Sequence, residues 1–128
     1  MKKLVLIVLL LAVTACAGSS GSKSSATPRD RATLTADDIQ KTGAIDAFTA
    51  VQALRPQWLT KRGSTSFRQV EVVRVYLDGN LMGGPEQLRQ ITTSSVETIR
   101  YMDGLEATQR YGLDHGQGAV LVFTKKGR

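Results

Sequence analysis

Cysteine, histidine and tryptophan each occur once in this 128-residue chain, and the scarcity of the first two excludes several kinds of site. With Cys16 as the only cysteine, an intrachain disulfide is impossible. The only histidine, His115, has no Cys-x-x-Cys pair or closely spaced acidic loop beside it, so no typical metal-ligand set is present. The N-terminal apolar run covers residues 4–13, whereas a membrane-spanning helix needs about 20 residues. We therefore predict no metal and no cofactor.

Positive charge exceeds negative charge only modestly. The 17 Lys and Arg residues outnumber the 11 Asp and Glu residues by six, and Lys2 and Lys3 supply two of that excess. Most basic residues are scattered, and neither a basic helix nor an aromatic stacking platform is recognisable. This pattern argues against nucleic acid as a partner.

Residues 1–15 have the pattern of a lipoprotein signal peptide. Lys2 and Lys3 precede the apolar run, as in the first two regions of a secretory signal. Residues 13–16, Val-Thr-Ala-Cys, resemble a bacterial lipobox, at which cleavage occurs before the cysteine. We predict that Cys16 is lipidated and anchors the protein in the membrane, since each buried CH2 contributes about 0.8 kcal/mol. Ala17 stands where an aspartate would favour inner-membrane retention, so we expect the outer membrane, on its periplasmic side.

Residues 16–33 are predicted to form a flexible, lipid-anchored tether. They are small and polar and show no periodicity, so they cannot bury enough apolar surface to offset their chain entropy. At roughly 5–6 Å times the square root of its length, such a tether reaches about 20 Å. The folded domain is then expected over residues 34–128.

Capping signals predict two helices at the start of this domain. Thr35 and an acidic residue three positions later predict a short helix that ends at Gly43. Asp46 predicts the cap of a second helix, with Ile45 packed against it as a hydrophobic staple. We interpret Trp58 as a lid over the core; the alternative is an exposed binding anchor.

Alternation of apolar side chains predicts a strand over residues 70–77. Asp78 and Gly79 then predict a tight hairpin turn, because both residue types tolerate positive φ. A short return strand at residues 81–82 follows, and Pro85 is placed to open a further helix.

Residues 96–125 read as strand, short helix, glycine-rich turn and strand. Gly112 is placed as a left-handed C-cap of the short helix. The last strand is apolar on both faces, which predicts a central strand covered on both sides. The length of about 30 residues is compatible with parallel strands joined by a right-handed crossover. The predicted fold is α+β, a small mixed sheet with short helices packed on it. Its expected core comprises Phe48, Val51, Leu54, Val73, Val75, Leu77, Ile99, Tyr101, Ala107, Val120 and Val122.

The same segment resembles the end of the plug domain of TonB-dependent outer-membrane receptors. That family has here an Ile-Glu-Val strand, a glycine, an Ala-Thr helix, Tyr-Gly, a glycine-rich turn and an apolar strand leading to Thr-Lys. The matching residues are Ile99, Gly104, Ala107, Thr108, Tyr111, Gly112, Gly116, Gly118, Val120, Val122, Thr124 and Lys125. Residues 75–79, Val-Tyr-Leu-Asp-Gly, resemble a second family motif. The resemblance spans residues 36–128 and marks as fold-signature residues Asp78, Gly79, Gly104, Tyr111, Gly112, Gly116 and Gly118.

The resemblance implies a plug-like domain that works beside an envelope receptor, but the sequence departs from the family. No barrel strands follow before Arg128, so we do not expect the protein to be the transporter itself. The tether holds no recognisable energy-coupling box. Arg100 stands where the family has an acidic residue, which disfavours docking inside a barrel.

No catalytic grouping emerges from the remaining residues. His115 lies near Asp114 and Asp103 in sequence, but no cysteine partner or convincing serine nucleophile accompanies it. We interpret His115 as a spacer in an exposed turn. Two functions remain: a non-enzymatic, lipid-anchored interaction module of an outer-membrane receptor or transport system, or a free-standing periplasmic module that binds a peptide, glycan or small ligand. A deep pocket would favour the second function.

Overall fold

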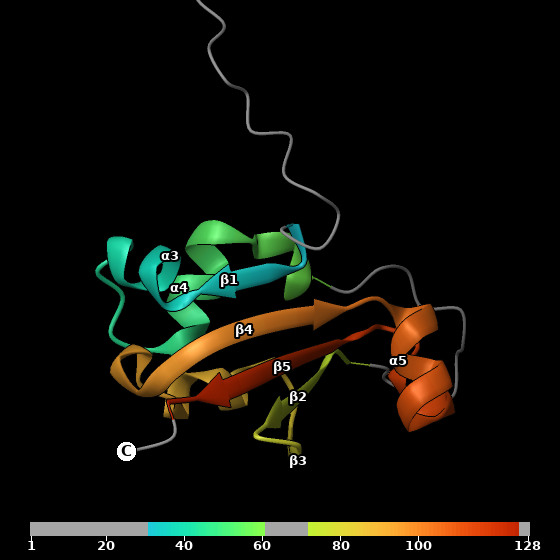
Figure 1. Cartoon of the computed structure of the whole chain (residues 1–128). Coiled ribbons are helices and arrows are strands. Elements are labelled where there is room, and N and C mark those ends of the chain that lie inside the picture. Colours follow the sequence, from blue (N-terminus) through green and yellow to red (C-terminus); the bar gives the residue numbers. More distant parts are fainter. Residues whose placement is uncertain (1–30, 61–71, 126–128) are drawn as a thin grey trace, which may run out of the picture.

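The computed structural model describes residues 31–60 and 72–125. A mixed five-stranded sheet forms the centre of the fold (Figure 1). The central strand, β5 (Ala119–Thr124), is parallel to its neighbour β2 (Arg74–Leu77), and the other neighbouring pairs are antiparallel. The prediction of a small α+β domain with a mixed sheet is therefore confirmed, and so is the central position of the last strand. The order across the sheet is β1 (Thr33–Thr35), β4 (Val96–Met102), β5 (Ala119–Thr124), β2 (Arg74–Leu77) and β3 (Asn80–Gly83).

Helices cover one face of this sheet. They are α3 (Ala36–Lys41), α4 (Ala47–Leu54) and the 3-10 turns η1 (Pro56–Trp58), η2 (Pro85–Gln90) and η3 (Thr93–Ser95). Apolar residues of α3, α4, η1 and η2 form one buried cluster with one side of β2, β4 and β5. We call this side the helix-covered face and the opposite side the open face.

The two predicted helix caps are confirmed. Thr35 and Asp38 form a reciprocal capping box: Thr35 N donates to the Asp38 carboxylate at 3.1 Å, and Asp38 N donates to Thr35 Oγ1 at 3.4 Å. The Asp46 carboxylate accepts from Thr49 N at 2.8 Å. The predicted staple at Ile45 is wrong, because this side chain is 80% exposed. Its carbonyl accepts from Thr93 N, a contact that fixes the backbone with the side chain turned outward.

Eight of the eleven predicted core residues are buried, whereas Phe48, Leu54 and Leu77 are only partly buried against the same cluster. The helix-covered face contains all but one of the predicted core residues, Ala107, which lies in a second cluster on the open face. Trp58 is 3% exposed, and its ring stacks on Tyr101 with the centroids 5.5 Å apart. The interpretation of Trp58 as a lid over the core is therefore confirmed.

The crossover considered for residues 96–125 is wrong. β4 and β5 are adjacent and antiparallel, with Ile99 opposite Val122. The connection runs through α5 (Gly104–Tyr111) and η4 (Leu113–His115), which lie at one end of the strands (Figure 1). A parallel crossover must carry the chain back along the full strand length, whereas this connection reverses it at the strand end.

The sheet begins before the predicted boundary at residue 34. Thr33 is already part of β1, and the carbonyl oxygen of Ala32 accepts from Tyr101 N at 2.8 Å. Residues 1–30, with Cys16 and most of the predicted tether, lie outside the described residues, as do residues 61–71 and 126–128. The strand predicted over 70–77 is observed from Arg74 to Leu77. Within the described ranges, no helix has the length and apolar character needed to cross a membrane.

Candidate functional site: the open face of the sheet

The hairpin between β2 and β3 borders the open face and is locked to the central strand. Asp78 (φ 47°) and Gly79 (φ 87°) form the predicted two-residue turn. Sequence reasoning missed a second role of Asp78: its carboxylate accepts from Thr124 N at 2.9 Å and from Thr124 Oγ1 at 2.6 Å. The side chain therefore joins the turn to the end of β5. This contact could not be predicted, because nothing in the sequence indicated that β2 and β5 are paired.

The other end of the face is shaped by backbone segments that approach each other closely. A Cβ atom on Gly104, at the start of α5, would collide with the carbonyl oxygen of Gly116. At Gly118 (φ 95°), a Cβ atom would lie 2.6 Å from the carbonyl oxygen of Met102. Gly116 itself has an ordinary φ of −56°. Close contact between main chains thus accounts for the glycines at positions 104 and 118.

Gly112 ends α5 with the predicted positive φ, but its ψ of 177° is extended and differs from that of the predicted left-handed cap. Its φ is 105°, and its N donates to Thr108 O at 2.9 Å. This conformation directs the chain back toward the sheet as η4, which brings His115 against β2. The chain reversal at Gly112 therefore positions His115, a side chain that was predicted from the sequence to be exposed to solvent.

The prediction that His115 is an exposed spacer is wrong: the residue is 6% exposed. Its Nδ1 lies 3.2 Å from Gly112 O, and a carbonyl oxygen can only accept, so Nδ1 carries a proton. In the neutral ring, Nε2 is then an acceptor, and it lies 2.8 Å from the hydroxyl of Tyr76 on β2. The ring of Tyr111 stacks on that of Tyr76 with the centroids 4.5 Å apart. These three rings dock α5 and η4 on one end of the open face.

This aromatic cluster is arranged for packing. Burial raises the pKa of Tyr76, with a further contribution from Tyr111, while Arg74 opposes it, so the Tyr76 hydroxyl stays protonated near neutral pH. His115 has both ring nitrogens engaged. Asp103, considered as its acidic partner, instead caps α5 by accepting from Glu106 N at 2.8 Å. Among residues 31–60 and 72–125, no group of three or more His, Cys, Asp or Glu side chains is placed to hold a metal ion.

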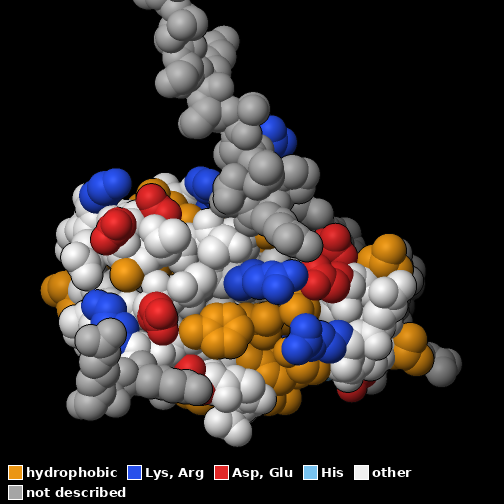
Figure 2. Space-filling model, in the orientation of Figure 1, with side chains coloured by type: hydrophobic (Ala, Val, Ile, Leu, Met, Phe, Trp, Pro, Cys, Tyr) orange, Lys and Arg blue, Asp and Glu red, His pale blue; other side chains and the backbone are white. Residues whose placement is uncertain are grey.

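A strip of apolar side chains crosses the rest of the open face. Strand register places Leu121 opposite Tyr76, and Tyr76 opposite Leu81. Phe123 follows on the same side of β5, because alternate residues of a strand share a face. Leu81 is 54% exposed and Phe123 is 42% exposed. Figure 2 shows this face, with apolar surface at its centre and charged side chains around it.

Two arginines flank the strip, and they differ in their partners. Arg100, opposite Leu121, contacts Glu106 on α5 with Nη2 and Oε1 3.0 Å apart. Arg74 lies two residues before Tyr76 on the same side of β2. Its Nε is buried and has no hydrogen-bond partner in the described structure. The open face thus combines exposed apolar side chains with an arginine whose Nε is buried and unpaired.

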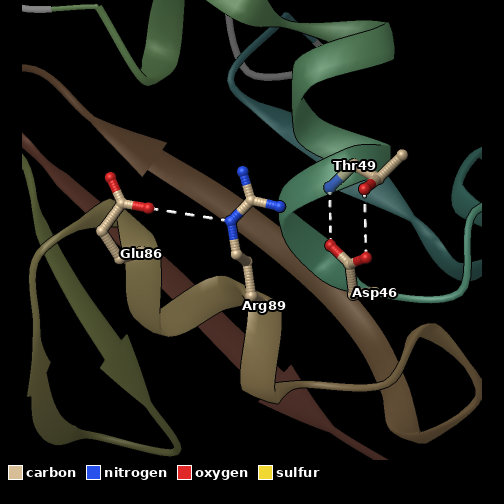
Figure 3. A network of polar contacts seen from close by, with 4 residues as sticks. All are labelled: Asp46, Thr49, Glu86 and Arg89. Atoms are coloured by element: carbon tan, nitrogen blue, oxygen red, sulfur yellow. Dashed lines mark hydrogen bonds and ion pairs between the residues drawn. The ribbon is translucent and has the colours of Figure 1, made fainter.

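A second candidate site lies on the helix-covered face. The guanidinium of Arg89 lies over the Phe48 ring, 3.9 Å from its centroid. Its Nε faces the Glu86 carboxylate at 3.7 Å (Figure 3). In the same view Asp46 binds Thr49, and the hydrogen bond from Thr49 N is the main cause of the lowered pKa of Asp46. A cavity of about 300 Å³ lies beside this group. Its lining consists of Phe48, Leu59, Val72, Val73, Pro85 and Glu86.

Comparison with known proteins yields no match to a family model, to a curated protein or to a solved structure. The resemblance to TonB-dependent receptor plug domains therefore stays a prediction that rests on the quoted residues.

Proposed function

We propose that this protein is a non-enzymatic, lipid-anchored module of the outer membrane, with a plug-like domain that serves a receptor or transport system. The open face carries the proposal. Leu81 and Phe123 are exposed on one side of a sheet whose other side is fully used by the core. Exposed apolar surface that polar and charged groups surround is typical of an interaction site.

The predicted anchor supports this role. A lipid on Cys16 and a tether of about 20 Å would confine the domain to a thin layer next to the membrane. Confinement of this kind raises the effective concentration of a membrane-bound partner, so a weak contact is sufficient for association. β1 lies at the edge of the sheet, with Thr33 opposite Arg100 of β4, so a tether that ends there would join the sheet at its border.

The anchor is tested with Cys16→Ser in full-length protein, with Ser20→Ala in the tether as the matched control. Metabolic labelling with a fatty acid should mark the wild type and Ser20→Ala but leave Cys16→Ser unlabelled as an uncleaved precursor. Chemical cross-linking in intact envelopes should then link the wild type to barrel receptors. Fatty-acid label on Cys16→Ser would disprove the anchor, and failure to enrich receptors would disprove the proposed partner class.

The cavity beside Phe48 favours the alternative, a periplasmic module that binds a peptide, glycan or small ligand. Its volume of about 300 Å³ lies at the lower end of the range for small-molecule sites. A thermal-shift screen with dipeptides and simple sugars would test it. A hit that is lost in Leu59→Trp, which narrows the cavity, but kept in Phe123→Ser would favour this function over the first.

A further inference from the structure

We infer that the open face is a docking surface for a segment of another protein in which a carboxylate side chain lies between apolar side chains, and that Arg74 binds this carboxylate. The inference deepens the proposed function and rests on it for the place of the encounter, the bacterial envelope. Three features argue for this occupant: the apolar strip, the unpaired Nε of Arg74 and the charge of the face.

The strip has the shape required for an extended segment. Leu121, Tyr76 and Leu81 lie opposite one another on three neighbouring strands, which are spaced by about 4.8 Å. Phe123 lies beside Leu121, one pleat further along β5. A segment that crosses the strands can therefore cover Leu81 and Phe123 together, and these are the two side chains of the strip that remain substantially exposed.

Arg74 supplies the polar anchor. Its Nε is buried without a partner, but the residue as a whole is only half-buried, so a carboxylate can reach its side chain and form short, charge-assisted and often bidentate hydrogen bonds with the guanidinium. Arg100 does not present the same opportunity, because Glu106 already contacts it. The charge complementarity therefore calls for one carboxylate near the α5 end of the strip.

The same charges argue against a lipid bilayer as the occupant. Attraction to anionic head groups is typical of clusters of about four to eight basic residues. Here Glu106 offsets the charge of Arg100, which leaves Arg74 and Arg110, the latter over the Tyr111 ring, fewer charges than such a cluster holds. A surface with so little net positive charge gains little from anionic lipid, whereas a single carboxylate on a peptide matches Arg74.

The test uses photo-crosslinking by the full-length protein in its own envelope. Leu81→p-benzoylphenylalanine places the reactive group on the open face, and Gln52→p-benzoylphenylalanine on α4 is the matched control on the other side. Mass spectrometry identifies the linked peptide. We expect a protein adduct at position 81 that exceeds the control and whose peptide contains Asp or Glu within a few residues of the link.

Arginine variants then test the anchor. Arg74→Gln should lower the adduct yield on the order of tenfold, the effect of losing a charge-assisted hydrogen bond. Lys41→Gln, at the end of α3 on the helix-covered face, should leave the yield unchanged. Arg74→Glu should be rescued when the acidic residue of the identified partner is changed to Arg. Circular dichroism checks that each variant is folded, and Phe123→p-benzoylphenylalanine replaces position 81 if that variant is not.

Several outcomes would overturn the inference: an adduct with lipid or with a second copy of this chain, no adduct above the Gln52 control, a linked peptide without Asp or Glu, or a yield indifferent to Arg74→Gln. Failure of the proposed function is distinguishable. Loss of the fatty-acid anchor in the wild type, with the Arg74-dependent adduct intact, removes the anchored module and leaves the docking surface.

Discussion

Replacing Tyr76 by Phe should destabilise the domain by about 1–3 kcal/mol, the usual cost of a buried polar group left without its partner. The structure defines the loss. Tyr76 is 7% exposed and His115 is 6% exposed, and the bond of 2.8 Å between the hydroxyl and Nε2 is the contact that disappears. Phe keeps the ring, so the stacking on Tyr111 is preserved. The measured loss therefore reports the hydrogen bond.

A double-mutant cycle separates this bond from general packing. His115→Leu alone leaves the buried Tyr76 hydroxyl unpaired, whereas the double variant removes both polar partners. The double variant should therefore lose less stability than the sum of the losses in the two single variants. Each single variant leaves one buried polar group unpaired, whereas the double variant leaves none. Urea unfolding can be followed by the fluorescence of Trp58, which stacks on Tyr101 within the core.

Two results would refute the reasoning. If Tyr76→Phe costs less than about 0.5 kcal/mol, it behaves as an ordinary surface substitution. If the single effects add within error, the two side chains are not coupled. Either result would show that the contact between Tyr76 and His115 contributes little to the stability of the domain.

Three further predictions concern the backbone, the core and a helix cap. Gly112→Val should cost about 1–3 kcal/mol, because a β-branched residue is strained at φ 105°; an unchanged urea midpoint would show that the helix end adapts. Val122→Asp should abolish cooperative melting, since it buries an unpaired charge in the central strand; a normal thermal melt would contradict that position of β5. Asp46→Ala should cost about 1 kcal/mol at neutral pH by removing the cap of α4. Because the hydrogen bond from Thr49 N lowers the pKa of Asp46 in the folded state, its stabilisation is complete above the ordinary carboxyl pKa and is lost as pH falls through the lowered one. The difference between wild type and Asp46→Ala should therefore shrink below about pH 4, and urea unfolding at a series of pH values would show a constant difference if the argument is wrong.

Features governed by neighbours in sequence were predictable. Thr35 and Asp46 cap their helices through residues three positions away, and the turn at Asp78 depends on its own backbone and that of Gly79. The C-cap at Gly112 belongs to the same class. In each case, the side chain or the absence of one fixes the local geometry before any tertiary contact forms.

Features that depend on strand order were not predictable. His115 is buried because it meets Tyr76, 39 residues away, and Asp78 binds Thr124, 46 residues away. Both contacts follow from the parallel pairing of β2 with β5, which hydrophobic periodicity does not specify. The edge strand at Thr33–Thr35 was missed because three residues are too few to show alternation.

The candidate site depends on this same strand order, which is why no motif pointed to it. Leu81 and Phe123 would each be unremarkable alone, since single exposed apolar residues are ordinary on protein surfaces. From the sequence alone, Arg74 would likewise be interpreted as an ordinary charged residue exposed to solvent. The order β5-β2-β3 brings these residues to one face, and α5 packs through Tyr111 on Tyr76 but leaves Leu81 and Phe123 exposed. Exposed apolar surface beside a buried donor without a partner is the combination that a carboxylate-bearing segment completes, and neither feature alone would indicate binding.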